Sequence, residues 1–366
     1  MRVFKCECGA TTFFNNSMCL SCSRELGFLP DKLQMVAFTG DDAGTIQTPH
    51  GSYRKCANYS REGVCNWLLP ADKVDELCQA CRLNNVIPDL NEQENRTLWQ
   101  ETELAKRRLV YSLDSLGLPV LAKADDAARG LAFDIKASTE SERVLTGHAD
   151  GLITLNLSEA DAAQREKIRL SLKERYRTLL GHFRHEVGHY FWDRLVADPG
   201  KHDEFRALFG DERADYAEAL KAHYAKETNP GFYEEFISHY AASHPWEDFA
   251  ETFAHYLHMV DTLETAEQYG FATPPASARD FEGLMTEWYR LTVALNSLNR
   301  SMGLQDAYPF SITGPVKEKL HYVHELIRNA KAPGKSAPAK VETRSTDAGK
   351  SERSSGATRE LGGDVL

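Results

Sequence analysis

Two histidines and a glutamate near the middle of the chain have the spacing of a catalytic zinc site. The segment reads His185-Glu186-Val187-Gly188-His189. Residues four apart on a helix lie on one face, so the rings of His185 and His189 can reach the same zinc ion. Glu186 lies beside them and can take a proton from an attacking water and deliver it to a leaving amine. The pattern predicts a zinc-dependent hydrolase. The alternative is a helix with two ordinary histidines and a solvated glutamate.

A catalytic zinc needs a third protein ligand, which this motif does not supply locally. The extended pattern HExxHxxGxxH is absent, because Trp192 and Leu195 stand at the positions of its glycine and last histidine. The ligand must come from elsewhere, and the segment 244–255 (HPWEDFAETFAH) is the candidate. Its proline and the acidic pair that follows indicate a helix start.

Three residues of that segment could face a metal. Glu247, Glu251 and His255 are four apart, so they share one face of the expected helix. Carboxylates at this spacing repel each other, so a metal or hydrogen-bond partner on that face makes physical sense. The alternative is a solvated acidic face. Three neighbouring histidines, His182, His255 and His258, are expected to be supporting or surface groups. Asp193 could accept a hydrogen bond from a ring N–H of His189.

All eight cysteines lie in the first quarter of the chain, mostly in close pairs. Disulfides are the alternative in a secreted chain, but close pairs without a secretion signal favour metal binding. We expect two structural four-thiolate zinc sites, formed by Cys6, Cys8, Cys19 and Cys22, and by Cys56, Cys65, Cys78 and Cys81. This module could dock a protein partner, bind nucleic acid, or only fold around metal. Its near-zero net charge favours a structural or protein-docking role.

The hydrophobic pattern divides the chain into three regions. We expect a zinc-ribbon module at 1–90, a mostly helical catalytic domain at 91–330, and a disordered tail at 331–366, which has no aromatic residue. In the catalytic domain the pattern predicts one long helix that carries the motif and runs to about 196. Further helices are expected at 94–116, 203–226, 230–242, 246–264, 279–300 and 316–330. Strands are expected at 131–136 and 151–157. The fold class is therefore α+β with a small sheet.

The strand at 151–157 alternates apolar and polar residues just before the motif helix. We expect it to be an edge strand that lines the active-site cleft and binds substrate as an added strand.

Composition excludes several other classes of protein. No apolar run of 18 residues appears, and the N-terminus lacks the apolar stretch of a signal peptide, so we expect a cytoplasmic protein without membrane contact. Residues 91–330 hold 27 basic against 39 acidic side chains. A basic stripe is missing, which argues against nucleic acid as the main partner.

The motifs also resemble a known family. HEVGH followed by EDFAETFAHY is similar to the gluzincin-type zinc peptidases, especially a bacterial family of zinc-binding metallopeptidases with an N-terminal zinc-ribbon region. The motif helices alone resemble the anthrax lethal factor group. That resemblance implies a zincin-like fold, with Glu247 as the third ligand, Glu251 orienting a ligand, and Tyr240 stabilising the oxyanion.

Two functions follow from these patterns. The first is a zinc peptidase that acts on peptide or protein substrates, with one catalytic and two structural zinc ions. The second is a non-catalytic adaptor, in which a zincin-like fold and the ribbon dock a protein partner. Glu186 discriminates between them, because an adaptor has no use for a general base.

Overall fold

The computed structural model describes most of the chain. The described residues are 2–39, 44–118, 120–139, 143–171, 174–225, 230–273 and 280–330. The tail that we expect to be disordered, 331–366, lies outside them.

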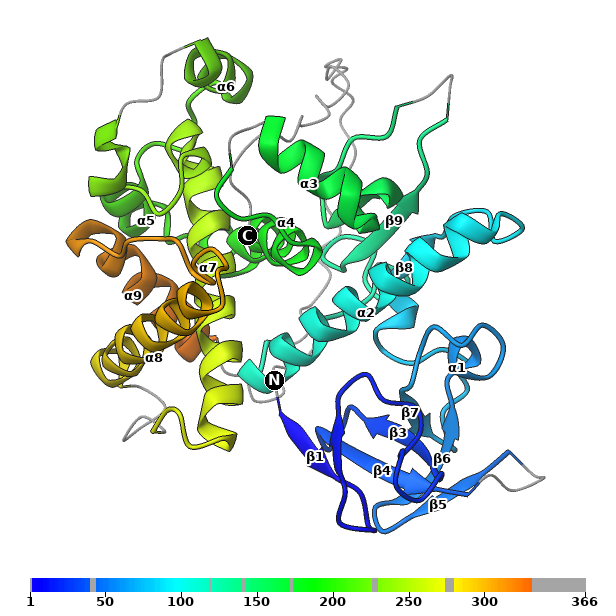
Figure 1. Ribbon diagram of the computed structural model, residues 1–366. Helices are drawn as coiled ribbons and strands as arrows, with labels where there is room; N and C mark the ends of the chain where they lie inside the picture. Colours follow the sequence, from blue (N-terminus) through cyan, green and yellow to red (C-terminus); the bar gives the residue numbers. More distant parts are fainter. Residues whose placement is uncertain are drawn as a thin grey trace, which may run out of the picture.

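Short antiparallel strands build the N-terminal region, shown in blue in Figure 1. They form three small sheets, β1 with β2, β3 with β4, and β5-β6-β7. Their bounds are β1 Val3–Lys5, β2 Thr11–Phe13, β3 Glu25–Leu29, β4 Gln34–Phe38, β5 Ile46–Thr48, β6 Gly51–Lys55 and β7 Leu68–Pro70. One helical turn, α1 (Ala57–Ser60), follows β6. Strands this short cannot bury a large core, so the region needs its cysteine sites for stability.

The middle of the chain contains one mixed sheet with the order β10-β11-β9-β8. Its strands are β8 Asn84–Val86, β9 Ala132–Lys136, β10 Gly147–Ala149 and β11 Leu152–Asn156. Strands β8 and β11 pair with β9 in parallel, and β10 pairs with β11 antiparallel. The expectation that 151–157 is an edge strand is therefore wrong. Strand β11 is internal because a tight hairpin turn returns the chain and places β10 at the edge.

Strand β8 ties the N-terminal region to this sheet. It lies before residue 90, directly after the 3₁₀ helix Cys81–Leu83, and pairs with β9. One continuous cluster of buried side chains also includes residues of both regions, such as Trp67 and Leu109. Removing residues 1–90 would take one strand from this mixed sheet.

Long helices make up the rest of the described chain. They are α2 Gln93–Leu116, α3 Ala162–Ser171, α4 Leu179–Trp192, α5 His202–Phe209, α6 Tyr216–Ala225, α7 Pro245–Gln268, α8 Phe281–Ser301 and α9 Gly314–Asn329. Helix α2 ends as expected at Gly117, whose φ of 71° is the left-handed conformation that closes a helix. In Figure 1, α2 runs between the N-terminal strands and the other helices. The α+β prediction is confirmed.

Three expected helices differ in the structure. The expected long helix that carries the motif and runs to about 196 is instead preceded by a separate helix, α3. Thr178 is extended, and its hydroxyl caps the start of α4 by accepting from the N–H of Gly181. The helix at 203–226 breaks at Gly210, whose φ is 96°. Only 3₁₀ turns, Pro230–Glu234 (η4) and Tyr240–Ser243 (η5), occur where 230–242 was expected.

The helices α4 and α7 pack closely against each other. A Cβ at Gly188 would lie 2.9 Å from the Cα of Ala250, so the two backbones approach as closely as only glycine allows. This contact lies between the two histidines of α4 and beside the glutamates of α7. It brings the two predicted ligand sets together.

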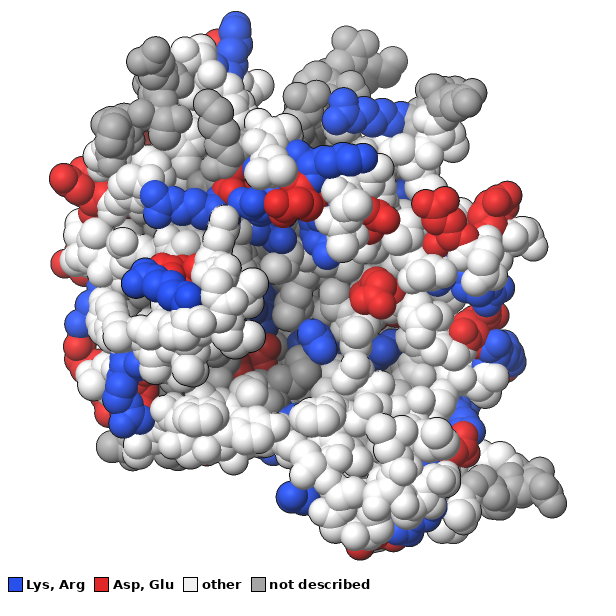
Figure 2. Space-filling view, viewed as in Figure 1, with Lys and Arg blue, Asp and Glu red and all other residues white. Residues whose placement is uncertain are grey.

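The surface carries charges of both signs. On the face in Figure 2, Lys and Arg side chains are interspersed with Asp and Glu. Among the described helices, each is too short or too polar to cross a bilayer.

Candidate active site

Two helices bring three ligand atoms to one point. The Nε2 atoms of His185 and His189 are 3.2 Å apart. Glu247 Oε2, from the first turn of α7, is 3.0 Å from the first and 3.3 Å from the second. Tetrahedral bonds of 2.0–2.1 Å to zinc would place ligand atoms about 3.3–3.4 Å apart. The three residues therefore fit a zinc ion.

The hydrogen bond on the far side of His185 explains why a cation fits. Its Nδ1 is 2.7 Å from Oε1 of Glu251, which accepts a hydrogen bond from the ring. Nε2, the other ring nitrogen, faces Glu247 and is the one that a metal ion could bind. Burial opposes protonation of His185, but hydrogen bonds to Glu247 and Glu251 outweigh it and raise its pKa to about 10. The site attracts positive charge.

The expected general base and oxyanion group lie beside this centre. Glu186 is 1% exposed on the same helix. The ring of Tyr240 lies 5.8 Å from the ring of His185 and is fully buried. Burial first, and then the charge of Glu247, raise the pKa of Tyr240 well above its ordinary value. The hydroxyl therefore keeps its proton and can donate it in a hydrogen bond.

A cavity of about 250 Å³ opens beside His189. It is lined by His148, Ala149, Asp150, His189, Trp192, Asp193 and Trp246. Asp193 begins the π-helical segment Asp193–Ala197 (η3) that continues α4, and it shares this cavity with His189. Part of the wall comes from β10 and the turn after it, so the free sheet edge lies beside the metal ligands.

Two residues near the centre were missed from the sequence. The ring of His148 on β10 stacks on His189 with centroids 6.1 Å apart. Tyr216 on α6 donates from its hydroxyl to Glu247 Oε1 at 2.8 Å. Neither lies within a helical repeat of the motif, so no spacing indicated them.

The other histidines near the motif serve different partners. His182 is buried, and its Nδ1 lies against a carboxylate oxygen of Glu159. Burial, and then the nearby charge of Arg177, lower the pKa of His182 to about 4. His255 is fully buried and lies 2.8 Å from the hydroxyl of Tyr308. They are therefore core groups, and the surface alternative is wrong for both.

His258 is only partly buried, and its Nδ1 lies 3.3 Å from a guanidinium nitrogen of Arg184.

The cysteines form the two expected sets. The four thiolates of each set lie within 4.8 Å of one another. Neighbouring sulfurs are 3.7 Å apart for Cys6 and Cys22 and 3.8 Å for Cys65 and Cys78. Zinc–sulfur bonds of 2.3 Å give tetrahedral edges of about 3.8 Å, whereas a disulfide would require about 2.05 Å. Both sets fit zinc. The second set is wholly buried, while Cys8 of the first is exposed.

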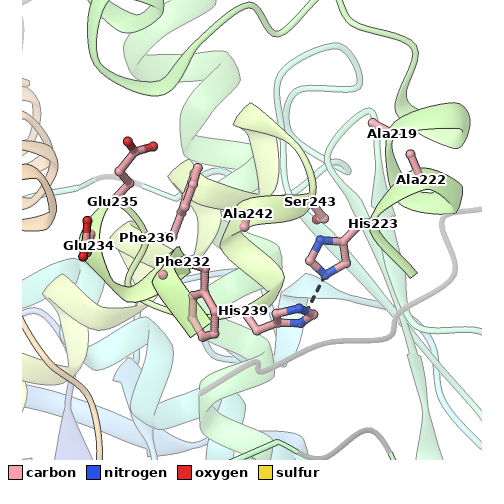
Figure 3. Close-up of a pocket in the computed structure, with 11 residues that line it drawn as sticks. Ala219, Ala222, His223, Phe232, Glu234, Glu235, Phe236, His239, Ala242 and Ser243 are labelled. Carbon is pink, nitrogen blue, oxygen red and sulfur yellow. Dashed lines mark hydrogen bonds between the residues drawn. The ribbon is translucent and has the colours of Figure 1, made fainter. Parts of the chain in front are cut away.

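A larger cavity, of about 640 Å³, lies between α6 and the segment of η4 and η5. In Figure 3, His223 of α6 faces His239 across it, and their ring nitrogens are 3.2 Å apart. Tyr240 follows His239 directly, so this cavity adjoins the wall of the metal site.

A helix carrying HEVGH, joined by a buried glutamate from a second helix, is the arrangement of a zinc-peptidase metal centre. Comparison with known families agrees. A model described as "Putative zinc-binding metallo-peptidase" matches residues 95–326, and a zinc-ribbon domain model matches residues 3–92. The chain belongs to this metallopeptidase family and carries its zinc ribbon, as the motifs predicted.

Relatives with closely similar sequences occur in mycobacteria. Uncharacterized proteins of Mycobacterium bovis and Mycobacterium tuberculosis are 41% identical over 338 residues, which cover 89% of this chain and 95% of theirs. No solved structure matches the chain.

Proposed function

We propose that this protein is a zinc-dependent peptidase of the gluzincin type. His185, His189 and Glu247 would hold the catalytic metal, and Glu186 would act as general base. The observation that carries the proposal is the mutual approach of three atoms that can each bind zinc, with Glu251 holding the opposite nitrogen of the His185 ring. The family membership supports the same conclusion.

Each side chain has a task in amide hydrolysis. Glu186 would accept a proton from the attacking water and pass it to the leaving amine. The hydroxyl of Tyr240 would donate to the developing oxyanion, and its raised pKa supports this role. Glu251 would fix the ring of His185, and Asp193 would orient His189. Zinc bound at the centre would supply a Lewis acid that acidifies water and polarises the scissile carbonyl.

We propose a peptide substrate that binds along β10. This strand is the edge of the sheet, and it contributes His148 and Ala149 to the wall of the cavity beside His189. An extended peptide could add to the free edge through main-chain hydrogen bonds and bring its carbonyl to the metal.

The ribbon would hold two further zinc ions, for three in the chain. Eight cysteines without disulfides suit a reducing compartment and support a cytoplasmic location. The second ribbon site packs into the common core and is structural. At the first site Cys8 is exposed and Cys22 is half-buried, which leaves room for a protein partner.

The decisive experiment uses the general base. Wild-type protein, loaded with zinc and quantified by metal analysis, should cleave members of a random peptide library. Glu186→Gln should keep all its zinc and lose cleavage by at least about 100-fold, as removal of a general base does. Equal cleavage by both proteins would indicate a contaminating protease. No cleavage by the fully loaded wild type across the library would favour the adaptor function.

A further inference from the structure

Helix α6 contacts the metal centre through Tyr216. Tyr216, its first residue, donates a hydrogen bond to Oε1 of Glu247 at 2.8 Å. The other oxygen of that carboxylate, Oε2, is the one that faces His185 and His189. The two oxygens of Glu247 therefore have different partners on different elements.

The rest of α6 is weakly packed. Of its ten residues only Leu220 is buried, and six are exposed. The cavity of about 640 Å³ separates its inner face, including Ala219 and Ala222, from η5. Both alanines line this cavity, and Figure 3 shows the hydrogen bond between His223 and His239 that bridges it. Within the described part of the chain, most of this helix is therefore exposed to solvent or faces the cavity.

The beginning of α6 is tied to the beginning of α7. His244, the N-cap of α7, accepts the backbone N–H of Trp246 on Nδ1. Its proton is therefore on Nε2, which donates to the carbonyl of Ala214 at 3.2 Å. The edge of the same ring packs against Tyr216, with centroids 5.2 Å apart. These contacts aim the tyrosine hydroxyl at Glu247.

We propose that Tyr216 is a positioning residue that couples occupation of the metal site to the ordering of α6. By occupying Oε1, its hydroxyl keeps Glu247 bound to metal through Oε2 alone, which leaves one coordination position open for water. A metal ion in turn fixes Glu247, and the fixed carboxylate holds Tyr216 and the helix that follows. The inference rests on Glu247 as a ligand in the proposed function, but it does not require that the protein cleaves peptides.

Hydrogen exchange tests the coupling directly. A mild chelator should strip the site at His185 and leave the four-thiolate sites loaded. Adding zinc back should slow exchange of the α6 amides by at least about tenfold in the wild type, while α5 stays unchanged. Tyr216→Phe should lose this protection, because its ring is kept and only the hydroxyl is removed. The matched control is Tyr224→Phe, a half-exposed tyrosine on the same helix, which should behave as wild type.

Metal binding gives the second readout. Tyr216→Phe should bind zinc at this site about 10–100-fold more weakly, as loss of a partner behind a ligand usually does. With cobalt at the site, its visible absorption should weaken as the freed Oε1 joins the metal and raises the coordination number. Unchanged affinity and spectrum would overturn the positioning role. Wild-type α6 exchange that does not respond to zinc would overturn the coupling, whether or not the variant folds. Absence of cleavage with intact coupling would count against the peptidase alone.

Discussion

The close contact of α4 with α7 predicts the effect of one added methyl group. In Gly188→Ala, the new Cβ would lie 2.9 Å from Cα and 3.1 Å from the carbonyl oxygen of Ala250. Carbon atoms in contact normally lie about 3.5–4.0 Å apart. Both opposing atoms are backbone, so no side chain can rotate away. The helices must therefore separate by about 0.5–1 Å.

The sign of the stability change depends on two opposed effects. Replacing glycine by alanine inside a helix favours folding by about 1 kcal/mol. Overpacking a tight core costs about 1–3 kcal/mol. Because the clash is with backbone, we expect the second effect to dominate and the free energy of unfolding to fall by about 1 kcal/mol.

Zinc affinity should change more than the free energy of unfolding. His185 and His189 lie on either side of Gly188, and Glu247 is three residues before Ala250. Metal–ligand distances tolerate about 0.2 Å, so the helix separation should weaken zinc binding by at least about tenfold, or 1.4 kcal/mol.

Urea unfolding and zinc competition with a chromophoric chelator measure the two effects. The control is Gly314→Ala, where a Cβ would meet nothing within 4 Å. It should leave zinc affinity unchanged and should not lower the free energy of unfolding, because alanine favours the helix and meets no clash. A Gly188→Ala protein that is more stable than wild type and binds zinc equally well would refute the reasoning.

Three further predictions concern other parts of the molecule. Glu247→Ala should abolish metal binding at the catalytic site, whereas Glu251→Ala should weaken it about 10–100-fold; equal losses in zinc titrations would contradict their different contacts. Cys81→Ser should lower the thermal unfolding temperature of the domain that contains β8, because its site directly precedes that strand. The same change at the exposed Cys8 should lower this temperature less. A larger effect at Cys8 than at Cys81 would contradict this account. Burial raises the pKa of Asp114 from 3.8 to about 6, with a hydrogen bond from Gln79 opposing it. The folded protein thus binds this proton more tightly than the unfolded chain, and stability falls as pH rises through 4 to 6. Asp114→Asn should therefore stabilise the protein at pH 7.5 by up to about 3 kcal/mol, with the gain shrinking near pH 4 in urea unfolding, and an equal gain at both pH values would contradict the shift.

The sequence predicted those parts of the site that lie on regular helices. His185 and His189 share a face by helical geometry, and the same geometry aligned Glu247 with Glu251. The two cysteine sets could also be predicted, because cysteines that are close in sequence can bind the same metal ion. The end of α2 was predictable because Gly117 takes a conformation that few other residues adopt.

Tertiary contacts decided the rest. Apolar residues recur at helical spacing from Ile168 to Phe183, on both sides of the break. Periodicity therefore could not detect that Thr178 starts a new helix. Strand β11 alternates like an edge strand, but its neighbour β10 is only three residues long and gives no pattern of its own. Tyr216 reaches Glu247 from a separate helix, 31 residues away. Such pairs follow from chain packing, which spacing alone does not encode.

The most direct test of the central claim is the position of zinc in crystals of the full chain. Anomalous scattering measured on both sides of the zinc absorption edge should give one peak within about 2.3 Å of the two histidine Nε2 atoms and Glu247 Oε2, besides one at each four-cysteine site. Glu251 should lie behind His185 without touching the metal. A map with no peak at the histidines, or with Glu251 or Asp193 bound to the metal and Glu247 turned away, would contradict the account.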